Sequence, residues 1–143
     1  MTKFLYTTRA TATGGRDDRV RTDDGAFAVG LASPKELGGN GQGNNPEQLF
    51  AAGYAACFLG AMKFVATQGK HVRVPAYSAV SATVGIGPRA DKGFGLAVTL
   101  AIVLPGLERA EAEALVAEAD TVCPYSHAVR GNIEVSLEVS TEA

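Results

Sequence analysis

The feature that most constrains the fold is a long apolar segment over residues 49–62. In front of it, Asn45 can cap a helix, Pro46 suits the first helical position, and Gln48 completes a capping-box-like pattern. Gly69 is a suitable C-terminal stop, so the sequence predicts a helix that runs to about residue 68. Apolar side chains occur on every side of this helix, which therefore needs cover on every side rather than on one face.

The residues on either side of this helix predict short strands. An Asp-Gly pair in the N-terminal part lies where a hairpin turn is expected. After the helix, apolar and polar residues alternate in three further segments, and a turn containing Gly and Pro joins the first two. The predicted strands are residues 3–13, 19–22, 27–31, 80–86, 94–104 and 133–139.

A second helix is predicted between the last two strands, over residues 108–122. It carries five acidic residues and one arginine as far as Asp120, a pattern that is typical of a solvated face. Cys123 precedes Pro124, which is expected to end or break this helix. The residues expected to face inward are Leu107, Ala114, Leu115 and Val122.

Three strands, a buried helix, two strands, a helix and a strand are typical of an α+β fold with largely antiparallel pairing. The length fits a single domain over residues 1–143. Six short strands and one small helix barely cover a helix that is apolar all round, so we expect a second copy to supply the missing wall in a homodimer. The small residues that share one face of the helix, and so allow another backbone to approach closely, are Gly53, Ala56, Cys57 and Gly60.

Composition and charge exclude several classes of function. A net charge of −2 lacks the basic surplus of a nucleic-acid binder. The apolar run is shorter than the roughly 20 residues of a membrane span, and the N-terminus has no signal-peptide pattern, so we expect a cytoplasmic protein without a membrane partner. The two cysteines form neither a disulfide scaffold nor a zinc-site spacing, and we expect no metal. A glycine-rich segment over residues 33–45 lacks the Gly-Lys-Ser/Thr ending of a phosphate loop, so a mobile loop is the preferred interpretation.

The two thiols have different settings. Cys57 lies within the apolar helix and is either an inert core residue or a reactive thiol that needs a cation from elsewhere in the fold, because burial alone raises a thiol pKa. Cys123 stands at a helix end before a proline, where we expect it to be accessible and locally mobile. Two nearby thiols would allow a sulfenic acid to close to a disulfide, provided that their Cα atoms come within about 7 Å. His127 leaves a thiol–histidine hydrolase site open, although a polar loop residue is the simpler interpretation.

The segments around these thiols are long and specific. They read NPEQLFAAGYAACF at residues 45–58 and VCPYSHAVRGNI at residues 122–133, and the chain also contains ATGGRD at residues 12–17. All three closely resemble the organic hydroperoxide resistance proteins, a branch of the OsmC-like family, and the resemblance runs nearly end to end. It implies an OsmC-like fold, with two largely antiparallel sheets around a long buried central helix in an intertwined homodimer.

The resemblance implies a thiol-dependent peroxidase that reduces alkyl or fatty-acid hydroperoxides to alcohols. Cys57 would attack the peroxide and become a sulfenic acid, and Cys123 would then close a Cys57–Cys123 disulfide. Arg16 would hold the thiolate and polarise the peroxide, while Glu47 would hold Arg16 in place. The family is reduced by dithiols, particularly lipoyl groups on proteins, and no bound cofactor is expected because the sulfur carries the electrons. The residues expected to form an apolar substrate-binding wall are Phe50, Tyr54, Phe58 and Phe94.

Helix geometry adds a constraint on this set. Glu47 precedes Cys57 by ten residues, which corresponds to about 15 Å along a straight helix, so both cannot serve one site within one chain. If both belong to the site, Glu47 must come from the partner subunit, with the two buried helices antiparallel. Two other functions stay open: a redox sensor in which disulfide formation is the signal, and a non-catalytic binding protein of the stress response.

Overall fold

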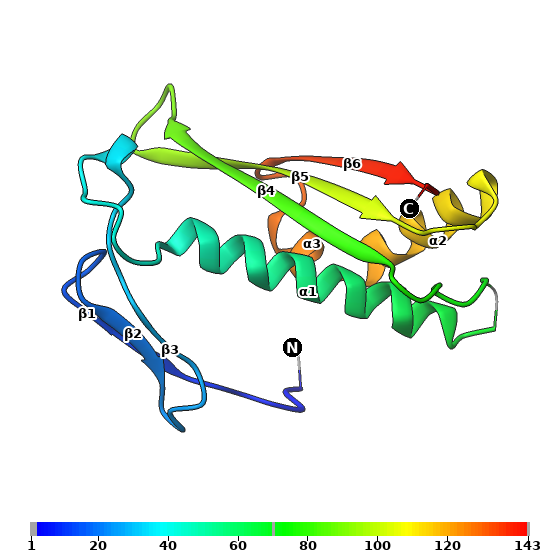
Figure 1. Cartoon of the computed structure of the whole chain (residues 1–143), viewed down its shortest axis with the longest axis horizontal. Helices are drawn as coiled ribbons and strands as arrows, with labels where there is room; N and C mark the ends of the chain where they lie inside the picture. Colours follow the sequence, from blue (N-terminus) through cyan, green and yellow to red (C-terminus); the bar gives the residue numbers. More distant parts are fainter. Residues whose placement is uncertain (1–2, 70, 143) are drawn as a thin grey trace. The chain divides into compact units, whose positions relative to one another are not determined.

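The computed structural model describes residues 3–69 and 71–142 (Figure 1). These residues form two compact units, one that ends at Leu49 and one that begins at Phe50. Each unit contains one three-stranded sheet, with the strand orders β1-β2-β3 and β4-β5-β6. The α+β class, the two sheets and the long helix predicted from the sequence are therefore confirmed.

The first sheet is a small antiparallel meander. Its strands are β1 (Ala10–Thr13), β2 (Arg19–Thr22) and β3 (Ala28–Gly30). The predicted turn at Asp24 is present, since the Thr22 N–H donates to the Phe27 carbonyl over 2.9 Å. The strand predicted over residues 3–13 is wrong in its first part. Pairing begins only at Ala10, because β2 offers four residues and its last partner for β1 is Thr22.

The glycine-rich segment over residues 33–45 contains one turn of 3-10 helix, η1 (Lys35–Leu37), and closes on itself. The Gly41 N–H donates to the Ser33 carbonyl over 3.0 Å. A Cβ at Gly39 would lie 2.0 Å from the same oxygen, so this close approach requires glycine. Because loop N–H groups are bonded to the loop's own carbonyls, they do not form a phosphate cradle.

Helix α1 (Pro46–Ala66) begins at the predicted signal. Asn45 and Gln48 form a reciprocal capping box: the Gln48 N–H donates to Asn45 Oδ1 over 2.9 Å, and the Asn45 N–H donates to Gln48 Oε1 over 3.1 Å. With 21 residues, α1 is long and apolar enough to cross a membrane, a property that the core helices of soluble proteins share. One face of α1 lies in a protein core through Tyr54, Phe58, Ala61, Met62 and Val65.

Another face of α1 carries small or apolar residues that are exposed. Its exposed residues recur every four positions and therefore form a stripe along the helix. These residues are Ala52, Ala56, Gly60 and Phe64. The homodimer predicted to cover this helix stays a prediction.

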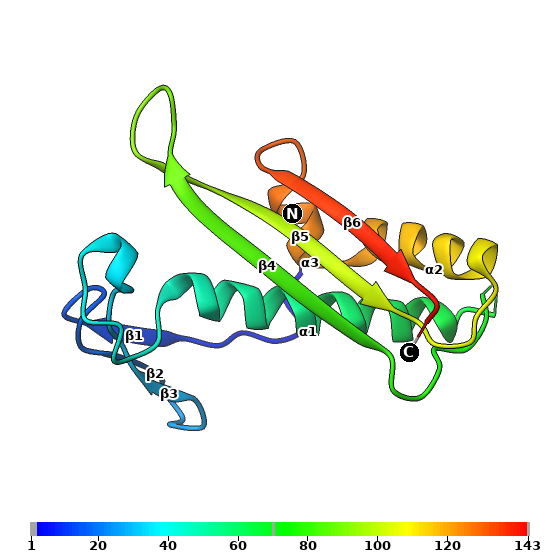
Figure 2. The same ribbon diagram turned by 45° about the horizontal axis from the view of Figure 1, so that its top comes forward.

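The second sheet has β5 (Phe94–Val103) at its centre (Figure 2). β4 (Ala79–Pro88) pairs with it in an antiparallel hairpin, as predicted. β6 (Glu134–Ser140) pairs with it in parallel, because the helices between β5 and β6 carry the chain back to the end from which β5 starts. The largely antiparallel pairing is thus confirmed with this one exception. The residues of β5 in the core are Val98, Leu100 and Ile102.

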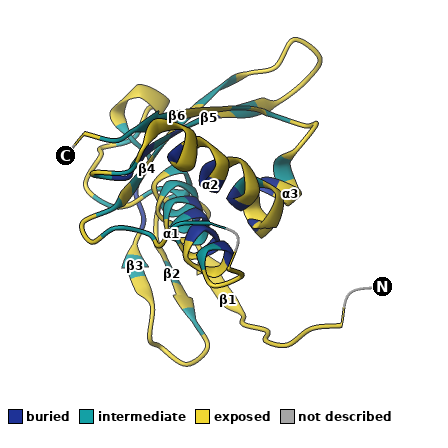
Figure 3. Cartoon of the chain, turned by 90° about the vertical axis from the view of Figure 1, so that its right-hand side faces the viewer, coloured by how far each residue is buried: buried dark blue, intermediate teal, exposed yellow. Residues whose placement is uncertain are grey.

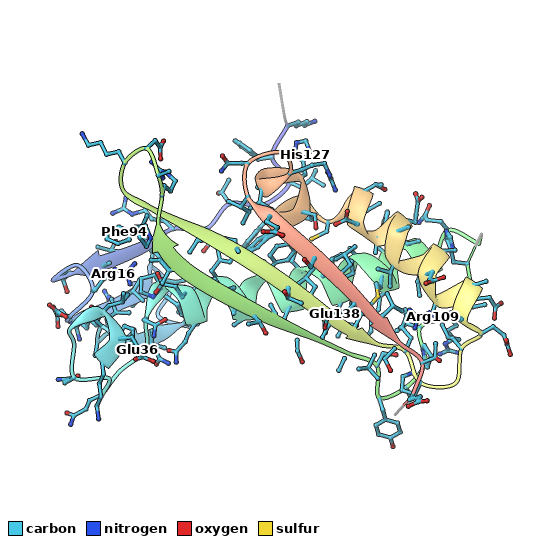
Figure 4. All side chains as sticks on the ribbon, turned by 90° about the horizontal axis from the view of Figure 1, so that it is seen from above. Arg16, Glu36, Phe94, Arg109, His127 and Glu138 are labelled. Carbon is cyan, nitrogen blue, oxygen red and sulfur yellow. The ribbon has the colours of Figure 1, made fainter. Side chains whose placement is uncertain are left out.

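Helix α2 (Arg109–Val122) lies where it was predicted, with one buried and one exposed side (Figure 3). At its start, the Arg109 guanidinium donates to the Val139 carbonyl of β6 over 2.6 Å (Figure 4). The predicted inward face is partly wrong, because Ala114 and Val122 are exposed and the buried stripe is rotated around the helix. The buried residues of α2 are Ala112, Leu115, Val116 and Ala119.

A short third helix, α3 (Pro124–Val129), is absent from the sequence prediction. Pro124 does end α2, but it also occupies the first position of α3, where its missing N–H costs nothing. Cys123 is the joint between the two helices and has an extended backbone, with φ −61° and ψ 120°. The second thiol is therefore held between two helices rather than at a free helix end.

Candidate functional site

The two thiols that the sequence separates by 66 residues meet in the second unit. Cys57 Sγ in the middle of α1 lies 3.3 Å from Cys123 Sγ at the α2–α3 joint, and both cysteines are free. A disulfide bond is about 2.0 Å long, so closing it requires the sulfur atoms to move together by roughly 1 Å. The distance between the two sulfur atoms is thus short enough for a disulfide to close with a small movement.

Exposure differs between the two thiols in the opposite sense from the prediction. Cys123 is fully buried, so the expectation that it is accessible and mobile is wrong. The reason is that Cys123, at the joint between two helices, lies in the hydrophobic core with residues of α1, α2 and β5. Cys57 is partly exposed, although it lies on the apolar helix. A molecule from solvent therefore reaches Cys57 before Cys123.

The surroundings of Cys57 oppose its ionisation. Burial raises the pKa of the Cys57 thiol to about 11; a hydrogen bond from the Tyr125 backbone lowers this pKa, and the neighbouring Cys123 thiol raises it. At such a pKa only about one thiol in 10⁴ is ionised at pH 7. No cation in the described part of the chain contributes to this pKa. A reactive Cys57 therefore needs a positive charge nearby to lower this pKa.

The first turn of α3 is docked on α1 next to the thiols. The Tyr54 hydroxyl and the Ser126 hydroxyl are 2.7 Å apart in a buried hydrogen bond. The ring of Tyr125 lies 5.8 Å from the ring of Tyr54, and its hydroxyl lies so close to Gly53 that a Cβ there would come within 2.9 Å of it. The sequence prediction did not single out Ser126 or Tyr125. Their signals were their place in the VCPYSHAVRGNI segment and the proline, which can begin a helix as well as end one.

Arg16 and Glu47 form a bidentate ion pair in the first unit. Arg16 Nη1 donates to Glu47 Oε2 over 3.0 Å, and Arg16 Nη2 donates to Glu47 Oε1 over 2.8 Å. The hydrogen bonds from Arg16 lower the pKa of the Glu47 carboxyl, so this carboxyl is ionised at neutral pH. The turn before Arg16 needs glycine at position 14, where φ is 71° and a Cβ would lie 2.5 Å from Asp18 Cβ. The structure thus brings Arg16 and Glu47 together, as the sequence resemblance implied.

α1 is a continuous helix that carries both Glu47 and Cys57. Their ten-residue separation therefore corresponds to about 15 Å along its axis. The ion pair holds the Arg16 guanidinium beside Glu47 of the same chain. Glu47 of the ion pair and Cys57 of the thiol pair lie on two separate stretches of the same helix.

The predicted aromatic wall does not lie open as a whole. Tyr54 and Phe58 are fully buried in the core, so no substrate reaches them without a rearrangement. Phe50 is partly exposed and packs on Tyr54, with the ring centroids 6.0 Å apart. Phe94 is 65% exposed at the first residue of β5 (Figure 4). Of these four aromatic residues, only Phe50 is both accessible to solvent and packed against Tyr54, which lies one helical turn before Cys57 on α1.

His127 lies on the outer side of α3 and is exposed (Figure 4). No side-chain hydrogen bond of His127 occurs within the described residues, so nothing there pairs it with a thiol as a hydrolase would require. The same residues contain no group of three or more His, Cys, Asp or Glu side chains that could hold a metal ion.

Known proteins are similar to this chain in sequence and in fold. Residues 39–138 match the family described as OsmC-like protein. An organic hydroperoxide resistance protein from Xanthomonas axonopodis pv. citri is 53% identical over 139 residues, which cover 96% of each chain. The chain belongs to the OsmC-like family. This membership confirms the resemblance found in the sequence.

Solved members of the family extend this comparison to the whole fold. The structure of an organic hydroperoxide resistance protein from Legionella pneumophila matches with a TM-score of 0.91 at 51% identity, covering 96% of this chain and 99% of that one. The structure of the organic hydroperoxide resistance protein OhrB of Bacillus subtilis matches with a TM-score of 0.85 at 40% identity, covering 95% and 99%. Both sheets, α1 and the helices that carry Cys123 are thus part of the family fold.

Proposed function

We propose that this protein is a two-cysteine peroxidase that reduces organic hydroperoxides to alcohols. The observation that carries this proposal is the 3.3 Å between the sulfur atoms of Cys57 and Cys123, with the first partly exposed and the second fully buried. A thiol that substrate reaches first, backed by a second thiol that solvent does not reach, fits a peroxidatic and a resolving cysteine. The names of the relatives support organic hydroperoxides as the substrate class.

The proposed cycle balances without a bound cofactor. The Cys57 thiolate attacks one oxygen of the hydroperoxide, the O–O bond breaks, and the alkoxide takes up a proton and leaves as the alcohol. Cys57 is then a sulfenic acid. Cys123, after losing its proton, attacks the Cys57 sulfur, and the sulfenic hydroxide leaves as water. A dithiol reduces the resulting disulfide by two thiol–disulfide exchanges and is itself oxidised.

We propose that a second copy of the chain supplies the missing cation. The Arg16–Glu47 pair is too far along α1 to serve Cys57 of its own chain, yet an antiparallel second α1 would bring its pair to the thiol. The exposed stripe at Ala52, Ala56 and Gly60 supports this arrangement, because side chains this small let two helix backbones approach closely. Arg16 would then hold the Cys57 thiolate and polarise the peroxide, and Glu47 would hold Arg16 in place.

The remaining assignments concern the substrate, the reductant and the compartment. We propose that the substrate's alkyl chain lies against Phe50, and that Phe94 contributes from the end of β5. Tyr54 and Phe58 would support this wall from the core side. Lipoyl groups on proteins are the proposed dithiol reductant, and the cytoplasm, where free thiols persist, is the proposed compartment.

A single experiment tests the function. The reduced protein is mixed with an alkyl hydroperoxide and dihydrolipoamide, and peroxide loss is followed together with the mass of the Cys57–Cys123 peptides. The proposed peroxidase gives sustained peroxide loss and a transient disulfide. A disulfide without sustained turnover indicates a redox sensor, and no thiol oxidation indicates a non-catalytic binding protein.

Replacing Cys123 by serine separates the two halves of the cycle. We expect one equivalent of alcohol per chain to be released at the wild-type rate, because Cys57 is unchanged. Steady turnover with the dithiol is expected to fall by about tenfold or more, since no disulfide forms and excess hydroperoxide oxidises the sulfenic acid to a sulfinic acid. Mass spectrometry of the Cys57 peptide measures the sulfinic fraction, and turnover equal to wild type would exclude Cys123 as the resolving residue.

The proposed dimer has its own test at the exposed stripe of α1. Ala56→Glu places a charge where two helices would meet, so we expect the variant to sediment as a single chain while the wild type sediments as a dimer. Peroxide turnover is expected to fall with it, because Arg16 no longer reaches Cys57. Ala114→Glu, on the exposed side of α2, is the matched control and should leave both properties unchanged. A wild type that sediments as a monomer and still turns over would contradict the shared site.

A further inference from the structure

We propose that Tyr54 and Ser126 position the resolving thiol. Their buried hydrogen bond holds the α2–α3 joint against α1, so that Cys123 stays next to Cys57 and the disulfide closes before a second peroxide arrives. This assignment rests on the proposed two-cysteine cycle. It gives Tyr54 a different role from the substrate contact expected from the sequence, and it makes Ser126 part of the machinery.

The hydrogen bond is well placed to act in this way. The two hydroxyls are 2.7 Å apart, Tyr54 has no exposed surface, and Ser126 is 3% exposed. Ser126 is the only buried polar residue in the described part of the chain. A buried hydroxyl that loses its partner also loses its solvation, so each of these two groups strongly favours the arrangement that keeps the other in reach.

The position of the bond along the two helical elements links it to the thiols. Tyr54 lies three residues before Cys57 on α1, and Ser126 lies three residues after Cys123. Residues three apart on a helix share one face, as Tyr54 and Cys57 do on α1. Cys123 has an extended backbone just before α3, and Ser126 lies in the first turn of that helix. The Tyr54–Ser126 bond and the Cys57–Cys123 contact therefore both join α1 to the start of α3.

Tyr125, in the same first turn of α3, also contacts α1. Its backbone hydrogen bond reaches the Cys57 sulfur, and its ring packs on Tyr54. Its hydroxyl occupies the space beside Gly53, where any larger residue would come within 2.9 Å of it. The absence of a side chain at Gly53 thus leaves room for the Tyr125 ring against α1.

The chemical consequence is a competition for the Cys57 sulfenic acid. Cys123 can attack the sulfur, which forms the disulfide and releases the hydroxyl as water. Alternatively, a second hydroperoxide can transfer an oxygen to the sulfur, which forms a sulfinic acid and a second alcohol. The first route is intramolecular, and its rate depends on how often Cys123 lies within reach. The Tyr54–Ser126 bond therefore sets the peroxide concentration at which Cys57 becomes over-oxidised to the sulfinic acid.

The test compares Tyr54→Phe with the wild type in single-turnover experiments. We expect the rate of disulfide closure to fall about tenfold relative to the rate of sulfenic acid formation with tert-butyl hydroperoxide, measured in the same variant. The sulfinic fraction at a fixed peroxide dose should rise by a similar factor. Tyr77→Phe removes the same hydroxyl from a side chain that is 94% exposed and serves as the matched control.

A second readout needs no peroxide. Equilibration of the Cys57–Cys123 pair with dithiothreitol measures the stability of the disulfide. A tenfold loss in the proximity of the thiols makes the disulfide easier to reduce, which corresponds to a rise in reduction potential of about 30 mV. Ser126→Ala removes the same hydrogen bond from the other side and is expected to give the same shift in reduction potential. This second variant keeps the test decisive if Tyr54→Phe folds poorly.

The double variant Tyr54→Phe/Ser126→Ala distinguishes positioning from packing. It leaves no buried hydroxyl without a partner, so its thermal stability should recover toward the wild type. Positioning predicts that closure stays slow in this variant, whereas a merely structural role predicts that closure recovers with stability. Unchanged closure and potential in both single variants would overturn the proposal. A wild type that forms no sulfenic acid would instead overturn the peroxidase function, while the potentials would still decide the positioning role.

Discussion

Replacement of Cys57 by serine is expected to abolish hydroperoxide turnover, with kcat/KM falling by roughly 10³-fold or more. Serine has nearly the shape of cysteine but does not ionise at neutral pH, so the fold is kept while the nucleophile is lost. The partly exposed position of Cys57 is the structural reason to assign the first attack to this thiol. The measurement is the rate of alkyl hydroperoxide loss with dihydrolipoamide in excess.

Cys123→Ser is the control for this variant, since Cys123 is the buried member of the pair. It should still release one equivalent of alcohol, whereas Cys57→Ser should release none. The opposite pattern, with alcohol formed by Cys57→Ser and not by Cys123→Ser, would reverse the two roles. It would also require α3 to open, because the structure leaves no route from solvent to Cys123.

Replacement of Arg16 by glutamine is expected to produce the second large effect, at least about 100-fold at pH 7. One copy of the chain leaves the pKa of the Cys57 thiol at about 11, because burial disfavours the thiolate. If Arg16 of a second copy lowers this pKa, its removal returns the thiol to the neutral form, with about one thiolate in 10⁴ at pH 7. The rate of Cys57 oxidation by hydroperoxide measures this fraction.

The pH profile identifies the cause of the loss. In Arg16→Gln the oxidation rate should rise about tenfold per pH unit between pH 7 and 10, because the thiolate fraction does so below the pKa. The wild type, with its thiol already ionised, should change little over this range. Arg19→Gln, an exposed arginine of β2, is the matched control and should behave as the wild type. Parallel pH profiles for Arg16→Gln and the wild type would exclude Arg16 as the activating cation.

The contact with Glu47 favours an arginine rather than a lysine at position 16. Arg16 makes two parallel hydrogen bonds to the carboxylate, and these fix the plane of the guanidinium. The same bonds lower the pKa of Glu47, so the carboxylate holds Arg16 throughout the neutral range. The pair is therefore a preformed unit in each chain, ready to be presented to the thiol of another copy.

The sequence predicted helices and strands well where short-range features, such as helix capping and apolar–polar alternation, determine the structure. The capping box at Asn45 and Gln48 placed the start of α1 correctly, and strict alternation placed β4, β5 and β6 within two residues. The prediction failed where the outcome depended on distant partners. The strand over residues 3–13 lost its first part because β2 is short, and α3 was missed because a proline alone does not tell an ending from a restart.

The sequence by itself determined that a long apolar helix lies at the centre of an α+β fold, and its motifs named the family and both thiols. Only the tertiary structure decided that the sulfurs lie 3.3 Å apart and that Cys123, not Cys57, is the buried one. It alone revealed the Tyr54–Ser126 hydrogen bond that joins α1 to α3. The physical reason is that periodicity and capping act over a few residues, whereas the distance and burial of two thiols 66 residues apart depend on how α3 packs against α1.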